Sequence, residues 1–253
     1  MELRWALAVV TGGGGGLGRE LAVGLGRLGA GVLVADRDLE AAEETARMVR
    51  ASRVQAWAMR VDVRDDVELR MLAHRARDLG GADVLVNNAG GWTPGDRQYP
   101  DAPVEDWSGT LDLNLRAPML LTQLFLADVE ARRGRRTGVP AVVNVASSAA
   151  LGTGGYGSPE YAAAKAGLVR FTTALADPAT AARARVMAVV PHWIGLDRAR
   201  AEWAALSEQE RAGLPPLIPP STVTRVVLDL VARGTAGEVV ELVGGHPPRV
   251  LSP

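Results

Sequence analysis

Short apolar runs alternate with longer amphipathic segments along nearly the whole chain, and this alternation restricts the fold more than any other feature. It predicts a parallel sheet that is covered by helices. The runs are apolar throughout, so both faces of the sheet should be buried. We therefore predict one α/β domain over residues 1–253, with a doubly wound parallel sheet of about seven strands and helices on both faces. The expected strands are residues 5–10, 32–35, 54–61, 84–86, 141–146, 186–190 and 239–243, and amphipathic helices are expected at 18–28, 38–50 and 67–79.

Composition excludes several classes of protein. The 253 residues are 47% hydrophobic and 23% charged, which suits one large core. A net charge of −1 gives no electrostatic reason to expect nucleic acid or an anionic membrane as a partner. The absence of cysteine excludes disulfides, thiolate catalysis and cysteine metal sites, and we expect no metal. No signal-peptide pattern and no long apolar span are visible, so the expected location is the cytoplasm.

A run of five glycines follows the first expected strand and precedes the first expected helix, in Thr11-Gly-Gly-Gly-Gly-Gly-Leu-Gly18. A glycine-rich backbone can approach a pyrophosphate closely, and amides at a helix N-terminus point at the anion. Two registers are open, because glycines 13, 15 and 18 fit G-x-G-x-x-G, while 12, 16 and 18 fit T-G-x-x-x-G-x-G equally well. Both predict a Rossmann-type dinucleotide site, to which we assign Gly12, Gly16, Leu17 and Gly18.

Acidic residues at the ends of the next two expected strands indicate which dinucleotide is bound. Asp36 lies eighteen residues past Gly18, where a carboxylate can accept hydrogen bonds from both ribose hydroxyls of adenosine. It repels a 2′-phosphate by about 4 kcal/mol for two unit charges about 4 Å apart at an effective dielectric of about 20. Arg37 offsets part of this repulsion, yet we favour NAD over NADP. Asp62, followed by Val63, is placed either to bind the adenine amino group or to cap a helix.

Tyr161 and Lys165 stand four residues apart in Tyr-Ala-Ala-Ala-Lys, within an expected helix over residues 160–175. This spacing puts both side chains on one helix face. A phenol ionises near pH 10, and an ammonium nearby favours the phenolate. Lowering the phenol pKa to about 7 takes roughly 4 kcal/mol, which one close cation and a positively charged cofactor ring can supply. The pair is therefore either a proton-transfer pair or a solvated surface pair.

The remaining motifs decide between these two interpretations. Asn87-Asn88-Ala89-Gly90 follows the fourth expected strand, Asn114 lies in Leu-Asn-Leu, and Ser148 lies thirteen residues before Tyr161. With these residues the chain resembles the short-chain dehydrogenase/reductase family over nearly its whole length. The family spacing selects Ser148 over Ser147, and the lysine selects Tyr161 over Tyr156.

The resemblance implies an NAD-dependent oxidoreductase that moves a hydride between NAD(H) and a secondary alcohol or ketone. Tyr161 would exchange a proton with the substrate oxygen. Lys165 would lower the Tyr161 pKa and bind the nicotinamide ribose, and Ser148 would donate a hydrogen bond to the oxygen where charge develops. Asn114 would hold a proton-relaying water, unless it is simply a polar residue at a helix irregularity. Asn88, Ala89 and Gly90 would form the floor of the cofactor site.

The chain departs from the family pattern after the sixth expected strand. The family typically has Pro-Gly there and a threonine four residues beyond the glycine. Here His192 follows Pro191, and Leu196, which has no hydroxyl, stands at the threonine position. Pro191 and the Ile194 backbone remain expected contacts of the cofactor. These changes leave the proton-transfer group untouched and predict a weaker or altered grip on the nicotinamide.

The substrate site is less specific. Trp92, Tyr156 and Trp193 occupy positions that line the substrate cleft in the family, and they form either a surface for a flat or apolar substrate or a packed lid. His192 either binds a polar substrate group or is satisfied by neighbouring backbone. The loops at 91–106 and 194–219 carry no readable ligand motif.

Other functions on the same fold stay open. One is a non-catalytic dinucleotide-binding regulator or scaffold, and another is a 3-oxoacyl reductase that serves a carrier protein. Against the reductase stand Asp36 and the acidic stretch 100–106. Lyase or epimerase chemistry with bound NAD is a further alternative. The resemblance also implies a homodimer or homotetramer built on the long helices after the fourth and fifth strands.

Overall fold

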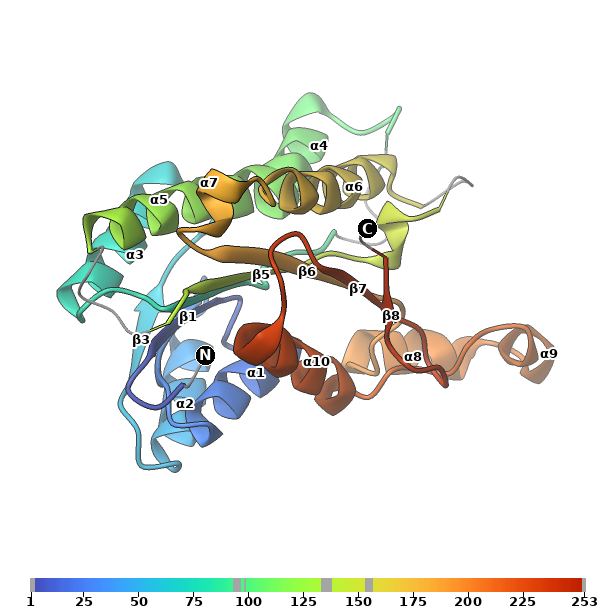
Figure 1. Cartoon of the computed structure of the whole chain (residues 1–253). Coiled ribbons are helices and arrows are strands. Elements are labelled where there is room, and N and C mark those ends of the chain that lie inside the picture. The colour runs from blue at the N-terminus through green and yellow to red at the C-terminus, as the bar shows by residue number, and fades with distance from the viewer. Residues whose placement is uncertain (1–2, 93–96, 98, 133–137, 153–156, 252–253) are drawn as a thin grey trace.

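The computed structural model describes residues 3–92, 97, 99–132, 138–152 and 157–251 (Figure 1). One sheet runs through this part of the chain in the order β3-β2-β1-β4-β5-β6-β7-β8. Strands β1 to β7 are parallel to their neighbours, and β8 is antiparallel to β7. The strands are β1 (Leu7–Thr11), β2 (Gly31–Asp36), β3 (Ala56–Arg60), β4 (Val84–Asn87), β5 (Ala141–Val145), β6 (Arg185–Pro191), β7 (Val239–Leu242) and β8 (Arg249–Val250).

Helices cover both faces of the sheet, so the predicted doubly wound α/β fold is confirmed. Figure 1 shows α1, α2 and α10 below the sheet and α4, α5 and α6 above it. The larger helices are α1 (Gly16–Arg27), α2 (Leu39–Arg50), α3 (Asp66–Asp78), α4 (Val104–Leu111), α5 (Ala117–Ala131), α6 (Pro159–Ala174), α8 (Asp197–Ala205) and α10 (Pro220–Arg233). Shorter ones are α7 (Pro178–Ala181), α9 (Glu208–Ala212), a 3₁₀ turn η2 (Ser148–Ala150) and a π-helical turn η1 (Asp112–Arg116).

Successive residues of each central strand enter different halves of the core. Val10 packs in a buried cluster that includes Leu21 of α1 and Val227 of α10. Its neighbour Val9 packs in another, with Phe125 of α5. This follows from the two-residue period of a strand. It also explains why the strands are apolar throughout, because each side chain on either face has to be buried.

All seven predicted strands are present, but the ends of the sheet differ from the prediction. Trp5 precedes β1 in a turn, with φ of 71° and 87% of its surface exposed, so the first strand begins later than expected. The two residues of β8 were not predicted. Both are exposed, and Arg249 is held by an ion pair of 2.6 Å to Glu241 of β7. A charged two-residue edge strand leaves no apolar pattern to detect.

The charged segment over residues 197–211 forms two helices, α8 and α9. Ser207 separates them and forms a capping box with Glu210, in which each side chain bonds the backbone amide of the other residue. These helices extend from the sheet edge beyond β7 (Figure 1). Among the described residues, no helix is long and apolar enough to cross a membrane.

The strand order reverses between β1 and β4, and this reversal positions the candidate site. In doubly wound sheets, ligands bind outside the carboxyl ends of the strands at such a switch point. The carboxyl ends of β1, β2 and β4 carry Thr11, Asp36 and Asn87, which are followed by the glycine loop, Arg37 and Asn88. The topology therefore brings the predicted site residues to one edge.

Candidate active site

The geometry of the glycine loop separates the two registers. Gly12 and Gly16 have φ of 62° and 50°, the left-handed region that favours glycine. A Cβ on Gly18 would lie 2.0 Å from the Gly12 carbonyl oxygen, so the helix can approach the loop only with glycine there. A Cβ on Gly15 would meet no atom within 4 Å. The structure therefore requires glycine at 12, 16 and 18 and not at 15, which favours the T-G-x-x-x-G-x-G register.

Asn88 holds the glycine loop from the neighbouring strand. Its Nδ2 donates to the carbonyl oxygens of Thr11 at 2.9 Å and Gly12 at 3.1 Å. The Thr11 hydroxyl accepts from the amides of Asn88 and Ala89, both at 3.1 Å. These reciprocal bonds fix the carboxyl ends of β1 and β4 together. Asn88 and Ala89 thus lie directly against the glycine loop, and their predicted contacts with the cofactor remain a prediction.

Asp36 lies at the end of β2 and lines a cavity of about 490 Å³. One carboxylate oxygen accepts from the Gly14 amide at 2.8 Å, and the other accepts from the Asp38 amide at 3.1 Å. A carboxylate oxygen has more than one lone pair, so each can still accept a further hydrogen bond. Arg37 lines the same cavity. The carboxylate is fixed at the position where an adenosine ribose is predicted.

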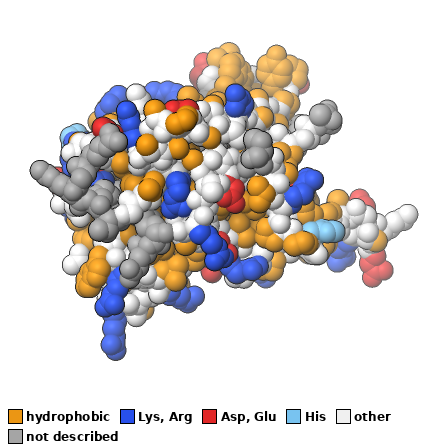
Figure 2. All heavy atoms as spheres, in the orientation of Figure 1, with side chains coloured by type: hydrophobic (Ala, Val, Ile, Leu, Met, Phe, Trp, Pro, Cys, Tyr) orange, Lys and Arg blue, Asp and Glu red, His pale blue; other side chains and the backbone are white. Residues whose placement is uncertain are grey.

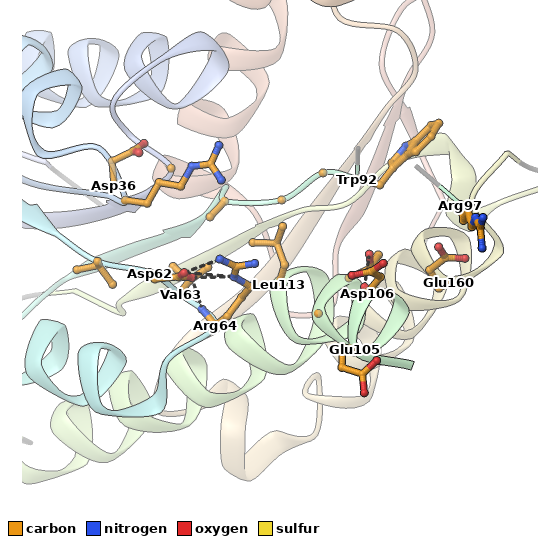
Figure 3. Close-up of a pocket in the computed structure, with 18 residues that line it drawn as sticks. Asp36, Asp62, Val63, Arg64, Trp92, Arg97, Glu105, Asp106, Leu113 and Glu160 are labelled. Atoms are coloured by element: carbon orange, nitrogen blue, oxygen red, sulfur yellow. Dashed lines mark hydrogen bonds and ion pairs between the residues drawn. The ribbon is translucent and has the colours of Figure 1, made fainter. Parts of the chain in front are cut away.

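Asp62 is neither a helix cap nor an isolated acceptor. Its carboxylate pairs with Arg64, whose closest nitrogen is at 2.6 Å, and this hydrogen-bonded pair lowers the pKa of Asp62 to about 2. Asp65 caps α3 instead, by accepting from the Val67 and Glu68 amides. The capping alternative for Asp62 is therefore wrong. Asp62 and Val63 do line the cavity, so their predicted adenine contacts remain a prediction (Figure 3).

Tyr161 and Lys165 share one face of α6, as their spacing predicts. The Lys165 ammonium lies 5.6 Å from the Tyr161 ring centroid. It is 3% exposed and donates to the Val145 carbonyl oxygen at 2.8 Å. Burial lowers the pKa of Lys165 to about 7. A solvated surface pair is excluded for the lysine, because its charge is held inside the protein next to the phenol.

Asn114 lies at the centre of the π-helical turn and is completely buried. Its amide nitrogen donates to the carbonyl oxygens of Gly91 at 2.8 Å and Thr110 at 2.9 Å, and its Oδ1 accepts from the Gly91 amide at 2.9 Å. A Cβ on Gly90 would lie 2.9 Å from both Asn114 Oδ1 and Lys165 Nζ. Asn114 therefore sits at a helix irregularity and also converges with Lys165 on Gly90, so both interpretations of this residue agree with its position.

The two adjacent serines have different environments. The Ser147 hydroxyl accepts from the Ala149 amide at 3.2 Å and caps the 3₁₀ turn that follows β5. Within the described part of the chain, the Ser148 hydroxyl makes no hydrogen bond. Ser148 therefore has a donor available for a ligand, and Ser147 is engaged in local structure. This agrees with the choice made from the spacing to Tyr161.

Trp92 connects the cavity with the predicted catalytic phenol. It lines the cavity, and its ring centroid lies 6.5 Å from that of Tyr161 at an angle of 49°. From the other side, Arg198 of α8 lies 5.8 Å from the Trp92 ring centroid and donates to the Trp92 carbonyl oxygen at 3.3 Å. Trp193 instead packs edge-on against Trp203 at 6.2 Å and is 43% exposed. Tyr156, a predicted substrate contact, lies outside the described residues.

The segment that departs from the family pattern is partly buried and is joined to β7 and to Ile218. The His192 Nε2 atom lies 3.0 Å from a Glu241 carboxylate oxygen, so the ring is engaged by a carboxylate and not by neighbouring backbone as one alternative expected. Burial alone would raise the pKa of Glu241, but hydrogen bonds from His192 and Arg249 outweigh it and hold that pKa below its usual range. Pro191 ends β6, and Ile194 pairs with Ile218.

Leu196 makes a contact that the sequence did not indicate. A Cβ placed on Gly16 would lie 3.5 Å from the Leu196 side chain, so Leu196 packs beside the glycine loop. Three further features of the site were missed. These are the Asp62–Arg64 pair, the contact of Arg198 with Trp92, and the burial of Glu160. The two-residue spacing of Asp62 and Arg64 was a usable signal, whereas the other contacts depend on tertiary packing.

The protein is a doubly wound α/β protein. Its glycine loop, the Asp36 carboxylate and the Tyr161–Lys165 pair are arranged as in a dinucleotide-binding site. The family model described as short chain dehydrogenase matches residues 6–205. The chain belongs to the short-chain dehydrogenase/reductase family of oxidoreductases.

Three known proteins illustrate the relationship. The 3-oxoacyl-[acyl-carrier-protein] reductase FabG of Pseudomonas aeruginosa is 32% identical over 246 residues, which are 96% of this chain and 90% of that protein. A 7α-hydroxysteroid dehydrogenase, solved with NADH and 7-oxo glycochenodeoxycholic acid, has a TM-score of 0.84 and 28% identity, with 96% and 95% of the two chains covered. The Pseudomonas aeruginosa RhlG/NADP complex has a TM-score of 0.83 and 26% identity, with 96% and 97% covered.

Proposed function

We propose that the protein is an NAD-dependent oxidoreductase that transfers a hydride between NAD(H) and a secondary alcohol or ketone. The observation that carries this proposal is the buried Lys165 ammonium beside the Tyr161 ring. Burying an unpaired cation is costly, so a fold keeps one where the charge has a use. With Ser148 and Asn114, this pair supplies a proton-transfer group, a hydrogen-bond donor and a buried polar connection. Asn114 and Lys165 lie against Gly90, which lines the cavity.

The residues present fit a dinucleotide. A Cβ at Gly12 would lie 2.9 Å from Ala89 Cα, so the loop depends on glycine to sit against the floor of the site. Exposed Gly15 and Gly16 leave the amides at the start of α1 open to an anion. We assign Asp36 to the adenosine ribose, the glycine loop to the pyrophosphate, and Lys165 with Tyr161 to the nicotinamide ribose.

The choice of NAD rests on Asp36. A 2′-phosphate beside its fixed carboxylate is repelled, and Arg37 is the nearest sequence neighbour that offsets the repulsion. The compared structures include both an NADH complex and an NADP complex, so they do not decide between the two.

In the proposed mechanism, the bound nicotinamide supplies the hydride chemistry and the protein supplies binding and proton transfer. For alcohol oxidation, Tyr161 Oη accepts the hydroxyl proton; for ketone reduction, it returns a proton to the carbonyl oxygen. Ser148 Oγ donates to the same oxygen and stabilises the charge that develops there. Lys165 stabilises the phenolate by its charge. Asn114 holds the backbone of Gly91 and Thr110 in place behind Lys165.

Two alternatives keep a specific motivation. A non-catalytic dinucleotide-binding regulator is motivated by Leu196, which packs where the family offers a hydroxyl. A carrier-dependent 3-oxoacyl reductase is motivated by the likeness to FabG. Against the reductase stand Asp36 and the acidic residues Glu105 and Asp106 along the cavity, because a phosphate-bearing carrier arm would be repelled by them.

We also propose a homodimer or homotetramer. A hollow of about 850 Å³ along α5 and α6 is lined largely by apolar side chains, among them Leu115, Met119, Leu126, Phe171 and Leu175. Figure 2 shows a further group of hydrophobic side chains at the top of the molecule, over α4. A light-scattering mass of one chain at micromolar concentration would refute the oligomer.

A fluorescence titration with NADH and, in parallel, NADPH tests the proposed cofactor. The six tryptophans provide the donor signal. Micromolar NADH affinity with NADPH binding at least tenfold weaker supports the role of Asp36. Equal affinities refute the preference for NAD, and binding of NADH without turnover of any alcohol or ketone supports the regulator instead. A preference for NADPH, followed by turnover of 3-oxoacyl substrates, supports the carrier-dependent reductase.

A further inference from the structure

The cavity has a second polar end, away from Asp36, which the proposed cofactor contacts do not use. Figure 3 shows Asp106 of α4 and Glu160 of α6 gathered there together with Arg97, whereas Asp36 and Asp62 lie at the opposite end. Glu160 directly precedes Tyr161, and Trp92, which contacts Tyr161, lines the same cavity. This end therefore lies next to the predicted catalytic phenol in both sequence and space.

Glu160 is an unusual carboxylate, because it is buried without a partner. Only 8% of the residue is exposed, and its Oε2 has no hydrogen-bond partner in the part of the chain that the structure describes. A buried carboxylate is normally paired or hydrogen-bonded, since burial of an unpaired charge costs several kcal/mol. Glu160 lines the cavity, so a cation that enters it can lie against this carboxylate.

The charges at the two ends indicate the sign of that molecule. At the Asp36 end, Asp36 and Asp62 are balanced by Arg37 and Arg64, which suits a dinucleotide whose own phosphates are held by the glycine loop. At the other end, the described part of the lining contains three carboxylates and one arginine. The members of this acidic end are Glu105, Asp106, Glu160 and Arg97. The excess negative charge favours a cation over a carboxylate, phosphate or carrier-bound acyl group.

A metal ion fits this end less well than an organic cation. No group of three or more histidine, cysteine, aspartate or glutamate side chains in the described ranges is arranged to hold a metal. A single buried carboxylate with a second one nearby instead resembles the acceptor set that an ammonium group needs, because an ammonium offers three donors and requires no fixed coordination geometry.

We propose that the acidic end selects substrates that carry a protonated amino group, with Glu160 as the carboxylate that binds the ammonium. The inference rests on the proposed function, because it makes an amino alcohol or amino ketone the substrate class of the same site. Glu160 is then a specificity residue: its charge interacts with the ammonium of the substrate, while Tyr161, one residue later in α6, acts on the oxygen.

Binding of matched ligands tests the proposal. The probes are straight-chain amino ketones with two to five methylenes between carbonyl and ammonium, each paired with the ketone in which a methyl group replaces the ammonium. Dissociation constants are measured by tryptophan fluorescence with NAD present, so that a ketone cannot be reduced, and again without NAD. At one chain length, we expect the amino ketone to bind at least tenfold more tightly, as hydrogen bonds to a charged group provide.

Glu160→Gln keeps the shape of the side chain and is expected to remove this preference. Glu43→Gln, which deletes an exposed carboxylate of α2 outside the cavity lining, is the matched control and should keep it. Because an unpaired buried charge is removed, Glu160→Gln should unfold at the same or a higher temperature than the wild type. Loss of preference therefore cannot come from unfolding.

Two results would overturn the inference. One is equal binding of the amino ketone and its methyl counterpart at every chain length, and the other is a preference that survives Glu160→Gln. Failure of the proposed function is recognised separately, as the absence of NADH consumption by the wild type with any ketone. Because the amine preference is measured as binding, it is decided whether or not hydride transfer occurs.

Discussion

Replacing Lys165 by methionine should remove a pH-dependent cost of burying an ammonium. The side chain is 3% exposed, and burial lowers its pKa from 10.5 to about 7. In the unfolded chain, a lysine keeps a pKa of about 10.4. Between these two values the unfolded protein holds one proton more than the folded protein. The free energy of unfolding therefore rises with pH across this window, because the unfolded state is the one that binds the extra proton.

The size of the effect follows from the same two pKa values. Below pH 7 the amine is charged in both states and the full cost is present, about 5 kcal/mol at about 1.36 kcal/mol per pKa unit. Above about pH 10.5 it is neutral in both states and the cost disappears. From pH 7 to pH 9, wild-type Lys165 should gain about 2 kcal/mol of stability relative to methionine, since the folded amine is still half protonated at the lower pH.

Urea unfolding followed by tryptophan fluorescence measures this difference. Lysine and methionine at position 165 are compared at pH 7 and pH 9, both in the Tyr161→Phe background, so that ionisation of the phenol does not contribute. The difference between their unfolding free energies should change by about 2 kcal/mol in favour of lysine as the pH rises. If the difference between the two unfolding free energies is the same at both pH values, burial does not lower the pKa of Lys165 and the reasoning is refuted.

Three further predictions concern the glycine loop, the proposed catalytic serine and Asp36. Gly18→Ala should cost about 3 kcal/mol of stability in urea unfolding and abolish NADH binding, because its Cβ would lie 2.0 Å from a carbonyl oxygen. Gly15→Ala is the control: a Cβ there meets open space, so stability should change by less than about 0.5 kcal/mol. Ser148→Ala should lower kcat roughly 100-fold at unchanged thermal stability. Ser147→Ala should mainly lower the stability of the protein, by about 1 kcal/mol, because the cap of the 3₁₀ turn is lost. Equal losses of kcat in the two variants would contradict the choice of Ser148 as the catalytic serine. Asp36→Ala should weaken NADH binding about tenfold and reduce the preference over NADPH in a fluorescence titration; an unchanged ratio would show that Asp36 does not discriminate.

The arrangement of the sheet could be predicted because each signal lies within a few consecutive residues. The apolar runs locate all seven parallel strands, since a strand buried on both faces needs no polar position. Strand β8 could not be predicted, because Arg249 and Val250 are exposed and their pairing depends on Glu241 of the neighbouring strand. The break between α8 and α9 was visible in principle, because Ser207 and Glu210 have the spacing of a capping box.

The candidate site shows the same division between local and long-range information. The one-turn spacing of Tyr161 and Lys165 gives their shared helix face, but only the packing shows that the ammonium is buried and its pKa lowered. The glycine register stayed open because five glycines in a row hide which ones the backbone requires. The burial of Glu160 had no sequence signal, since a glutamate in the first turn of a helix is ordinarily solvated near the helix N-terminus.

In the proposed reaction, Tyr161 transfers the proton while a hydride moves between NAD(H) and the carbon of a carbon–oxygen bond. The most direct test follows NADH absorbance with wild type and Tyr161→Phe over a panel of secondary alcohols and ketones that includes amino ketones. We expect turnover by the wild type and a loss of at least about 100-fold in kcat for Tyr161→Phe. The NADH affinity, measured separately by fluorescence, should change only modestly. Equal turnover by the two proteins, or NADH binding with no turnover by the wild type, would contradict the proposed reaction.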